Sequence, residues 1–291
     1  MFITIGLPFY NAEETLGDAI RSVFAQTHQD WELILLDDGS TDRSLEIAKS
    51  VKDPRVRVYS DGKNKKLASR LNEIARLAKY DYISRMDADD LIFPEKIEVQ
   101  LKYLLESPEY DLIATGVYSV KNNLEIQGIR GYSYECPTFS DVVSRKSGII
   151  HASLLVRKSW YQRNTYDEEL IISQDFDLWL RAVKANDFMI KSISSPLYIY
   201  REEGNVSSEK LIRSGRITRF LLRKYAGKLK YKLVLKSYLK LIVIYVLEFS
   251  GMLHKIQKRR GNQNISVSQI EAYWAALKTI ESTSVPGISD K

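Results

Sequence analysis

The chain has 291 residues, of which 44% are hydrophobic and 27% are charged, a composition typical of a globular protein with one large domain or a domain plus a helical appendage. Its single cysteine, Cys136, excludes an internal disulfide framework and fits a reducing compartment. The net charge of +6 is uneven, because residues 209–260 contain 15 Lys/Arg and two Asp/Glu, a net of +13, whereas the remainder contains 28 and 35, a net of −7.

The first 120 residues alternate between short apolar runs and helical patterns. Strands are expected at Ile3–Leu7, Glu32–Leu36, Val56–Tyr59, Tyr82–Met86 and Leu112–Val117, and helices at Glu14–Gln26, Thr41–Lys49, Leu67–Ala78 and Pro94–Leu105. This alternation predicts βαβ units, and therefore an α/β, Rossmann-like fold with a mainly parallel sheet and helices on both faces. Ligands of such sheets bind beyond the carboxyl ends of the strands.

From residue 121 onward the pattern is mixed. It indicates a strand at Ser153–Val156, a helix at Phe176–Ala185 and an extended segment at Ile190–Tyr200 that Pro196 interrupts. We therefore predict a domain at 1–207, with a nucleotide-binding half at 1–120 and an acceptor half at 121–207. A helical, basic C-terminal extension is expected at 208–291.

Within this extension, Lys232, Lys236 and Lys240 share one helical face beside the apolar run Leu241–Leu247. That run is shorter than the roughly 20 residues that span a bilayer. We expect residues 209–260 to lie flat on an anionic membrane surface or to meet a phosphate-bearing acceptor; the alternative is a basic helix pair packed on the body. An acidic body disfavours nucleic acid as the partner. The amphipathic stretch Ile265–Ile280 suggests no particular role.

The first residues, Met1–Gly6, contain no basic region and no cleavable apolar segment. They are typical of a first strand. We expect a cytoplasmic protein, peripheral on the inner face of the cell membrane.

Acidic residues occupy three places at strand or helix ends. Asp37-Asp38 follows the second strand, Asp87-Ala88-Asp89-Asp90 follows the fourth, and Asp175 and Asp177 open the helix at Phe176. Carboxylates gathered at one sheet edge repel one another unless a cation lies between them. Mn²⁺ or Mg²⁺ is the natural partner of such oxygen ligands and of a diphosphate. Taken singly, each group also has a structural interpretation as a turn or a helix cap.

Five motifs in order resemble family 2 glycosyltransferases of the GT-A fold, over residues 3–207. They are Gly6-Leu7-Pro8-Phe9-Tyr10-Asn11-Ala12-Glu13-Glu14, Leu36-Asp37-Asp38-Gly39-Ser40-Thr41-Asp42, Ala68-Ser69-Arg70-Leu71-Asn72, Arg85-Met86-Asp87-Ala88-Asp89-Asp90 and Gln174-Asp175-Phe176-Asp177-Leu178-Trp179-Leu180-Arg181. The resemblance implies an enzyme that moves a sugar from a nucleotide-diphosphate sugar, with UDP the favoured nucleotide, to a glycan acceptor that is lipid-linked or on the cell surface.

The resemblance also implies roles for individual residues. Pro8, Phe9, Tyr10, Asn11 and Glu13 would wrap the nucleotide, and Asp38 would accept a hydrogen bond from the uracil. Asp87 would lie near the ribose and the metal, with Ala88 beside it, and Asp89 would coordinate the metal in an Asp-x-Asp motif. Arg70 would face the donor phosphates; the alternative for Arg70 is a surface arginine on a helix.

Asp175 corresponds to the catalytic base of the family, which takes the proton of the acceptor hydroxyl. Attack opposite the diphosphate would invert the anomeric centre. The chain departs from the family in having Gln174 before the base and Lys65-Lys66 where a glycine is usual. It also lacks the Gln-x-x-Arg-Trp motif of processive synthases, which favours transfer of one sugar per encounter. Trp160 is interpreted as a core residue or an acceptor platform.

Two other functions remain open from the sequence. A nucleotidyltransferase that makes nucleotide sugars would need a glycine-rich, basic loop after the first strand, where this chain has Pro8-Phe9-Tyr10-Asn11. An inactive module that binds nucleotide sugars or glycans is the other alternative, and the retention of Asp38, Asp87, Asp89 and Asp175 argues against it.

Overall fold

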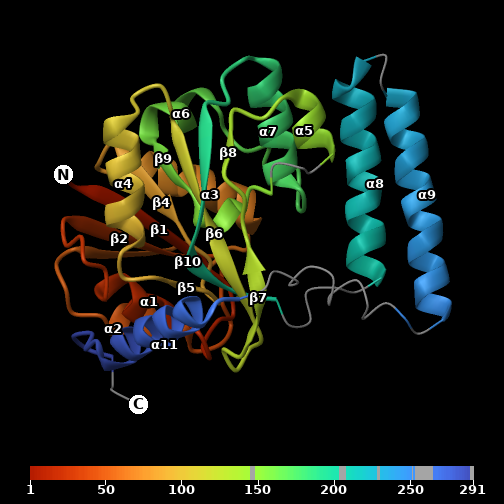
Figure 1. Ribbon diagram of the computed structural model, residues 1–291. Helices are drawn as coiled ribbons and strands as arrows, with labels where there is room; N and C mark the ends of the chain where they lie inside the picture. Colours follow the sequence, from red (N-terminus) through yellow and green to blue (C-terminus); the bar gives the residue numbers. More distant parts are fainter. Residues whose placement is uncertain (145–147, 203–207, 228–229, 251, 253–264, 289–291) are drawn as a thin grey trace.

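A computed structural model describes residues 1–144, 148–202, 208–227, 230–250, 252 and 265–288 (Figure 1). Over these residues ten strands form one sheet in the order β3-β2-β1-β4-β9-β6-β10-β5, with β7 on β6 and β8 on β10. The strands are β1 Ile3–Phe9, β2 Trp31–Asp37, β3 Val56–Ser60, β4 Tyr82–Arg85, β5 Leu91–Ile92, β6 Leu112–Val120, β7 Ile126–Arg130, β8 Tyr134–Glu135, β9 Leu155–Arg157 and β10 Ile190–Arg201.

Helices lie on both faces of this sheet, as the sequence predicts (Figure 1). They are α1 Leu16–Phe24, α2 Ser44–Ser50, α3 Lys66–Leu77, α4 Lys96–Glu106, α5 Phe139–Ser144, α6 Lys158–Arg163, α7 Gln174–Lys184, α8 Ser208–Tyr225, α9 Lys230–Phe249 and α11 Val267–Ser282, with a 3₁₀ turn at His151–Ser153.

The longer strands pair in parallel. Strand β1 pairs in parallel with β2 and β4, β2 with β3, and β6 with β10. Strand β9 is antiparallel between β4 and β6. The prediction of an α/β fold with a mainly parallel sheet is confirmed. Because β2, β1 and β4 are neighbours, the segments that follow them emerge at one edge.

Strand β2 shows why these residues form buried strands. It is buried along its whole length. Leu33 and Leu35 face one core with α1 and α4, whereas Ile34 and Leu36 face a second core with α3 and α7. A strand that helices cover on both faces has a sequence of consecutive apolar residues.

The extended segment around Pro196 forms strand β10. Its register against β6 shifts on both sides of Pro196, between Ile193 and Tyr198. A proline has no N–H for the ladder, so the strand accommodates it as an irregularity and then resumes pairing.

The amphipathic stretch near the C-terminus forms helix α11, which packs on the sheet. Ser266 and Gln269 form a capping box at its start. Tyr273 and Leu277 are buried against a core that includes Tyr118 and Phe93, and Lys52 donates its backbone N–H to the carbonyl of Pro286 at 2.7 Å. The predicted domain boundary at residue 207 stays a prediction. Helix α11 comes after that boundary in the sequence, yet it packs on the predicted first domain.

Helices α8 and α9 form an antiparallel pair beside the body (Figure 1). Leu221 of α8 is buried in the core that contains α7, and the hydroxyl of Tyr225 donates to Oδ1 of Asp177 at 2.9 Å. Among the described helices, none combines the length and the apolar character needed to cross a membrane.

Candidate active site

The loops that follow β1 and β2 are tied together by hydrogen bonds. Oδ1 of Asn11 accepts from the backbone N–H of Thr41 at 2.8 Å, and Oγ of Ser40 accepts from the N–H of Asn11 at 3.1 Å. Oε2 of Glu13 accepts from the N–H of Arg43 at 3.0 Å. The two loops therefore form one rim at the carboxyl edge of the sheet.

Pro8 and Phe9 lie within strand β1 rather than in the loop after it. The strand is two residues longer than its apolar run suggests, because Phe9 still pairs with Asp37. Both side chains are buried, and Phe9 belongs to the core. Tyr10 is half exposed. The contact of these residues with a nucleotide remains a prediction.

Asp38 is held by donors from the start of helix α3. Its Oδ1 accepts from the backbone N–H of Lys65 at 2.7 Å and from Nε of Arg70 at 2.9 Å, and its Oδ2 accepts from the N–H of Lys66 at 3.1 Å. The orientation of this carboxylate is thus fixed by the protein itself, since both oxygens accept hydrogen bonds. Its predicted bond to a uracil is not tested by this arrangement.

Arg70 is fully buried and surrounded by carboxylates, so the interpretation as a surface arginine is wrong. Besides Asp38, it donates to Glu73 at 2.8 Å and to Asp61 at 2.7 Å. Burial lowers the pKa of Arg70, but the hydrogen bonds to Asp61, Asp38 and Glu73 outweigh this effect and raise the pKa above its usual value. The hydrogen bond from Arg70 is also the largest cause of the lowered pKa of Asp61. Arg70 orients Asp38, and its contact with donor phosphates remains a prediction.

The Asp-x-Asp segment follows strand β4 and is clamped by strand β10. Oδ1 of Asp87 accepts from the buried Arg85 at 2.5 Å, and the N–H of Asp87 donates to the hydroxyl of Tyr198 at 3.1 Å. That hydroxyl donates to Oδ2 of the buried Asp90 at 2.9 Å, and Oδ1 of Asp90 accepts from the N–H of Arg201 at 2.8 Å. Asp90 is therefore a structural anchor of the segment.

Ala88 and Asp89 lie at the tip of this segment. The carbonyl of Ala88 accepts from Oγ1 of Thr15 at 2.9 Å, and the carbonyl of Asp89 accepts from the guanidinium of Arg201. The Asp89 side chain reaches the surface. Its carboxyl pKa is raised because the surrounding protein removes part of its solvation and because the charge of Asp87 is close.

The pair Asp87 and Asp89 suits a divalent cation. Two close carboxylates whose mutual repulsion raises a pKa are stabilised by a cation between them. The described residues contain no cluster of three or more His, Cys, Asp or Glu arranged for a metal. Mg²⁺ and Mn²⁺ at phosphate-transfer sites use one or two carboxylates together with substrate phosphates, so a pair is a sufficient protein contribution.

Asp175 lies in the first turn of helix α7 and is partly exposed. Its Oδ1 accepts from the N–H of Phe176 at 2.8 Å. Asp177, two residues on, is fully buried and bonds Arg181 at 2.8 Å. Of the two acids that open this helix, Asp175 alone presents a carboxylate to solvent, whereas Asp177 joins α7 to α8.

Tyr166 belongs to the core that contains α3 and α7. It is buried, and its hydroxyl lies 2.7 Å from Nε2 of His151. Burial is the largest cause of the raised pKa of Tyr166, and the charge of Tyr161 adds to it. The positive charge of Arg85 opposes this rise, whereas the negative charge of Asp175 makes a further small contribution to it. Tyr166 is therefore within electrostatic reach both of Asp175 and of the arginine that binds Asp87. Burial and Arg85 lower the pKa of His151, which favours a neutral imidazole there.

Sequence reasoning assigned no role in the site to Arg85, Tyr166 or Tyr198. The resemblance placed Tyr200-Arg201 in a segment that closes over the donor, but the contacts of Arg201 with Asp89 and Asp90 were not predicted. Arg85 could have been predicted from the sequence, since it lies two residues before Asp87. Tyr198 and Arg201 are more than 100 positions from their partners, and only the β10–β5 pairing brings them there. The structure also excludes Trp160 as an acceptor platform, because its ring is fully buried and its Nε1 donates to the carbonyl of Asp187.

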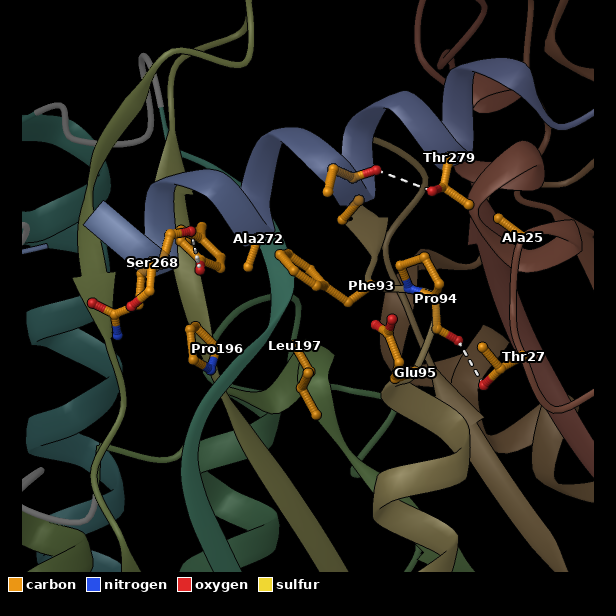
Figure 2. Close-up of a pocket in the computed structure, with 14 residues that line it drawn as sticks. Ala25, Thr27, Phe93, Pro94, Glu95, Pro196, Leu197, Ser268, Ala272 and Thr279 are labelled. Carbon is orange, nitrogen blue, oxygen red and sulfur yellow. Dashed lines mark hydrogen bonds between the residues drawn. The ribbon is translucent and has the colours of Figure 1, made fainter. Parts of the chain in front are cut away.

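A separate pocket of about 610 Å³ lies under helix α11 (Figure 2). Its wall combines residues of α11 with Phe93, Pro94 and Glu95 and with Pro196 and Leu197 of β10. None of the predicted site residues lines it. It is distinct from the carboxylate edge.

Similar structures show the same fold. The Staphylococcus aureus TarS 1–349 structure in complex with UDP superposes with a TM-score of 0.61 at 18% identity, covering 81% of this chain and 70% of that one. The mannosyltransferase PcManGT of Pyrobaculum calidifontis, in complex with GDP-Man and Mn²⁺, has a TM-score of 0.57 at 16% identity, covering 94% and 79%. The chain has the GT-A fold.

Sequence relatives identify the family. EpsE of Bacillus subtilis (strain 168), named as a glycosyltransferase, is 32% identical over 216 residues, which is 70% of this chain and 74% of EpsE. A chondroitin synthase of Escherichia coli is 28% identical over 190 residues, 64% of this chain but 27% of the synthase. The sequence profile of Glycosyl transferase family 2 matches residues 4–162. The chain belongs to glycosyl transferase family 2.

Proposed function

We propose that this transferase moves one sugar per encounter from a UDP-sugar to a hydroxyl of a glycan acceptor, with inversion at the anomeric carbon. The observation that carries the proposal is the acidic loop after β4, where Arg85 binds Asp87 at 2.5 Å and the Tyr198–Asp90 contact holds the backbone that carries Asp89. Asp175, the partly exposed acid of α7, is proposed to face this loop across the bound sugar.

In this proposal Asp175 takes the proton of the acceptor hydroxyl as that oxygen attacks. A positioned general base typically contributes about 10²–10⁴-fold to the rate. Asp87 and Asp89 would hold Mn²⁺ or Mg²⁺, and the bound cation would supply stabilisation of the negative charge on a diphosphate leaving group. Arg85 keeps Asp87 in place, and the Tyr198–Asp90 clamp keeps the loop in place. Attack by the acceptor oxygen on the face of the sugar opposite the diphosphate would invert the configuration.

The rim made by Tyr10, Asn11 and Glu13 with Asp38 receives the nucleotide. UDP is supported by the solved TarS structures, which contain UDP and UDP-GlcNAc. PcManGT contains GDP-Man, so GDP-sugars are the comparison to make. Family membership favours the transferase over the nucleotidyltransferase and over an inactive module.

The acceptor is proposed to be a lipid-linked or cell-surface glycan, met at the inner face of the membrane. The support is the net charge of +13 over residues 209–260, which complements anionic lipid. Transfer of a single sugar is supported by Leu178-Trp179-Leu180-Arg181, which stands where processive synthases carry their motif.

A thermal-shift screen of UDP- and GDP-sugars, each with and without Mn²⁺, tests this proposal. A ligand that binds only the folded chain adds about 2.7 kcal/mol of stability at 100 times its Kd. We expect a UDP-sugar to raise the Tm strongly in the presence of Mn²⁺ and weakly without it. A Tm that no nucleotide sugar changes under either condition would contradict the proposal.

A further inference from the structure

The outward face of helix α9 is an exposed apolar stripe. Its members recur at three- and four-residue intervals, which places them on one side of an α-helix. They are Tyr231, Leu235, Leu239, Ile242, Val246 and Phe249, with exposed fractions of 76%, 61%, 55%, 58%, 59% and 97%. Large apolar side chains gathered in this way mark an interaction surface.

Contacts with α8 fix the direction in which this stripe points. Nη1 of Arg219 donates to Oγ of Ser237 at 3.4 Å, and its guanidinium lies 4.6 Å from the ring centre of Tyr238. Arg223 donates to the hydroxyl of Tyr238 at 3.3 Å. Because α8 is itself fixed to the body by Leu221, the pair presents the stripe away from the enzyme.

A row of lysines runs along one flank of the stripe. Lys232, Lys236 and Lys240 each follow a stripe residue by one position, about 100° around the helix, and all three are exposed. Lysine side chains at such positions keep their methylenes on apolar surface and extend the ammonium toward polar headgroups.

Charge determines which occupant fits this face. Residues 208–250 contain 11 Lys/Arg and two Glu, a net of +9. Two copies meeting through this face would bring like charges together, whereas an anionic bilayer offers both complementary headgroups and an apolar interior. An apolar stripe flanked by lysines suits a helix that lies in the interface.

We propose that the stripe of α9, with Lys232, Lys236 and Lys240, is the surface that docks this protein on an anionic membrane. This inference deepens the membrane contact of the proposed function and assigns it to one helix face. The apolar stripe inserts beneath the headgroups, and the lysine row contacts their negative charge.

The test is co-sedimentation of the full chain with vesicles of phosphatidylglycerol and phosphatidylcholine, compared with vesicles of phosphatidylcholine alone. We expect binding to the anionic vesicles, and we expect Leu239→Ser/Ile242→Ser/Val246→Ser to lower the partition coefficient at least tenfold. The matched control is Leu105→Ser/Ile171→Ser/Val267→Ser, which alters three apolar residues that are 49%, 51% and 72% exposed elsewhere. This control should bind like the unaltered chain.

A second pair of variants tests the lysine row. Lys232→Gln/Lys236→Gln/Lys240→Gln should weaken binding about tenfold or more at low salt and reduce its salt dependence, because each lysine near an anionic surface contributes to attraction. Lys49→Gln/Lys79→Gln/Lys278→Gln removes three exposed lysines outside the pair and should have little effect.

Nucleotide-sugar binding, followed by thermal shift without lipid, shows whether each variant is folded. It also separates failure of this inference from failure of the proposed function. Equal vesicle binding by the stripe variant and the unaltered chain would overturn the inference, as would the absence of binding by the unaltered chain. Sedimentation that shows a lipid-free dimer, lost only in the stripe variant, would overturn it in favour of a second copy.

Discussion

The hydroxyl of Tyr198 lies 2.9 Å from Oδ2 of Asp90, and this contact fixes strand β10 to the loop that carries Asp87 and Asp89. The same hydroxyl accepts the backbone N–H of Asp87 at 3.1 Å. One phenol thus contacts the acidic loop at two points, Asp87 and Asp90. The loop depends on a residue that is more than 100 positions away in the sequence.

Tyr198→Phe should lower the free energy of unfolding by about 1–3 kcal/mol, because it leaves a buried donor and a buried carboxylate without this partner. It should also weaken donor binding in the presence of Mn²⁺, since the acidic loop loses its anchor. Chemical denaturation and calorimetry measure the two effects. Tyr200→Phe, two residues along β10 and outside this contact, is the control; equal losses in both variants would argue against the anchor.

Asp89→Ala should abolish the part of donor affinity that depends on metal. The variant removes the exposed carboxylate of the pair while Asp87 keeps its bond to Arg85. Titration calorimetry with and without Mn²⁺ measures this. Asp30→Ala, which removes an exposed carboxylate just before β2, should leave the affinity unchanged. An Asp89→Ala protein that still gains affinity from Mn²⁺ would exclude Asp89 as a metal ligand.

Leu277→Ala should destabilise the protein by about 2–5 kcal/mol, because it opens a cavity between α11 and the sheet. Trp274→Ala changes an exposed residue of the same helix and should cost far less. Denaturant titration compares the two. Similar small losses in both variants would mean that α11 is only loosely attached. Truncation after Ser207 would remove α11 as well as α9, so point variants are the sharper test of membrane docking.

Lys96 gives a pH-dependent prediction. Its ammonium is fully buried, its Nζ donates to Oγ of Ser84 at 3.0 Å, and burial lowers its pKa to about 7 from 10.5. Between these pH values the unfolded chain holds a proton that the folded chain has released, so stability rises with pH across this window, by at most about 1.4 kcal/mol per unit.

Lys96→Met should therefore be more stable than the unaltered chain at pH 7, and its advantage should shrink toward pH 10. Urea unfolding at pH 7 and pH 9.5 measures the difference. A stabilisation of the same size at both pH values would show that the pKa of Lys96 is not lowered.

Local pattern was sufficient to predict the first half of the fold. Strand β2 and helix α3 were expected because a continuous apolar run and a helical repeat are unambiguous. The turn at Asp37-Asp38-Gly39-Ser40 was also predictable, because glycine readily adopts the positive φ that such turns need. In the structure Gly39 has φ +76°, and a Cβ there would lie 2.9 Å from the backbone of Lys63. Strands β5 and β8 were missed because they have two residues each, and β7 was missed because only two of its five residues are apolar.

The acidic residues of the site were predictable from the sequence, but the residues that hold them in place were not. Asp38 and Asp87 follow strands, and that position is visible in the sequence. The burial of Arg70 was not visible, because Asp38 and Asp61 reach it only when α3 packs beside β2 and β3. Likewise, the packing of α11 was missed because an isolated amphipathic pattern does not show which surface it will cover.

The central claim is that Asp175 is the base of a metal-dependent sugar transfer. The most direct test is the rate of nucleoside diphosphate release from the UDP-sugar that the thermal-shift screen selects, with Mn²⁺ and at saturating donor, for Asp175→Asn and the unaltered chain. We predict a fall of about 10²–10⁴-fold in kcat with donor Kd unchanged. Release at nearly the original rate would contradict the claim.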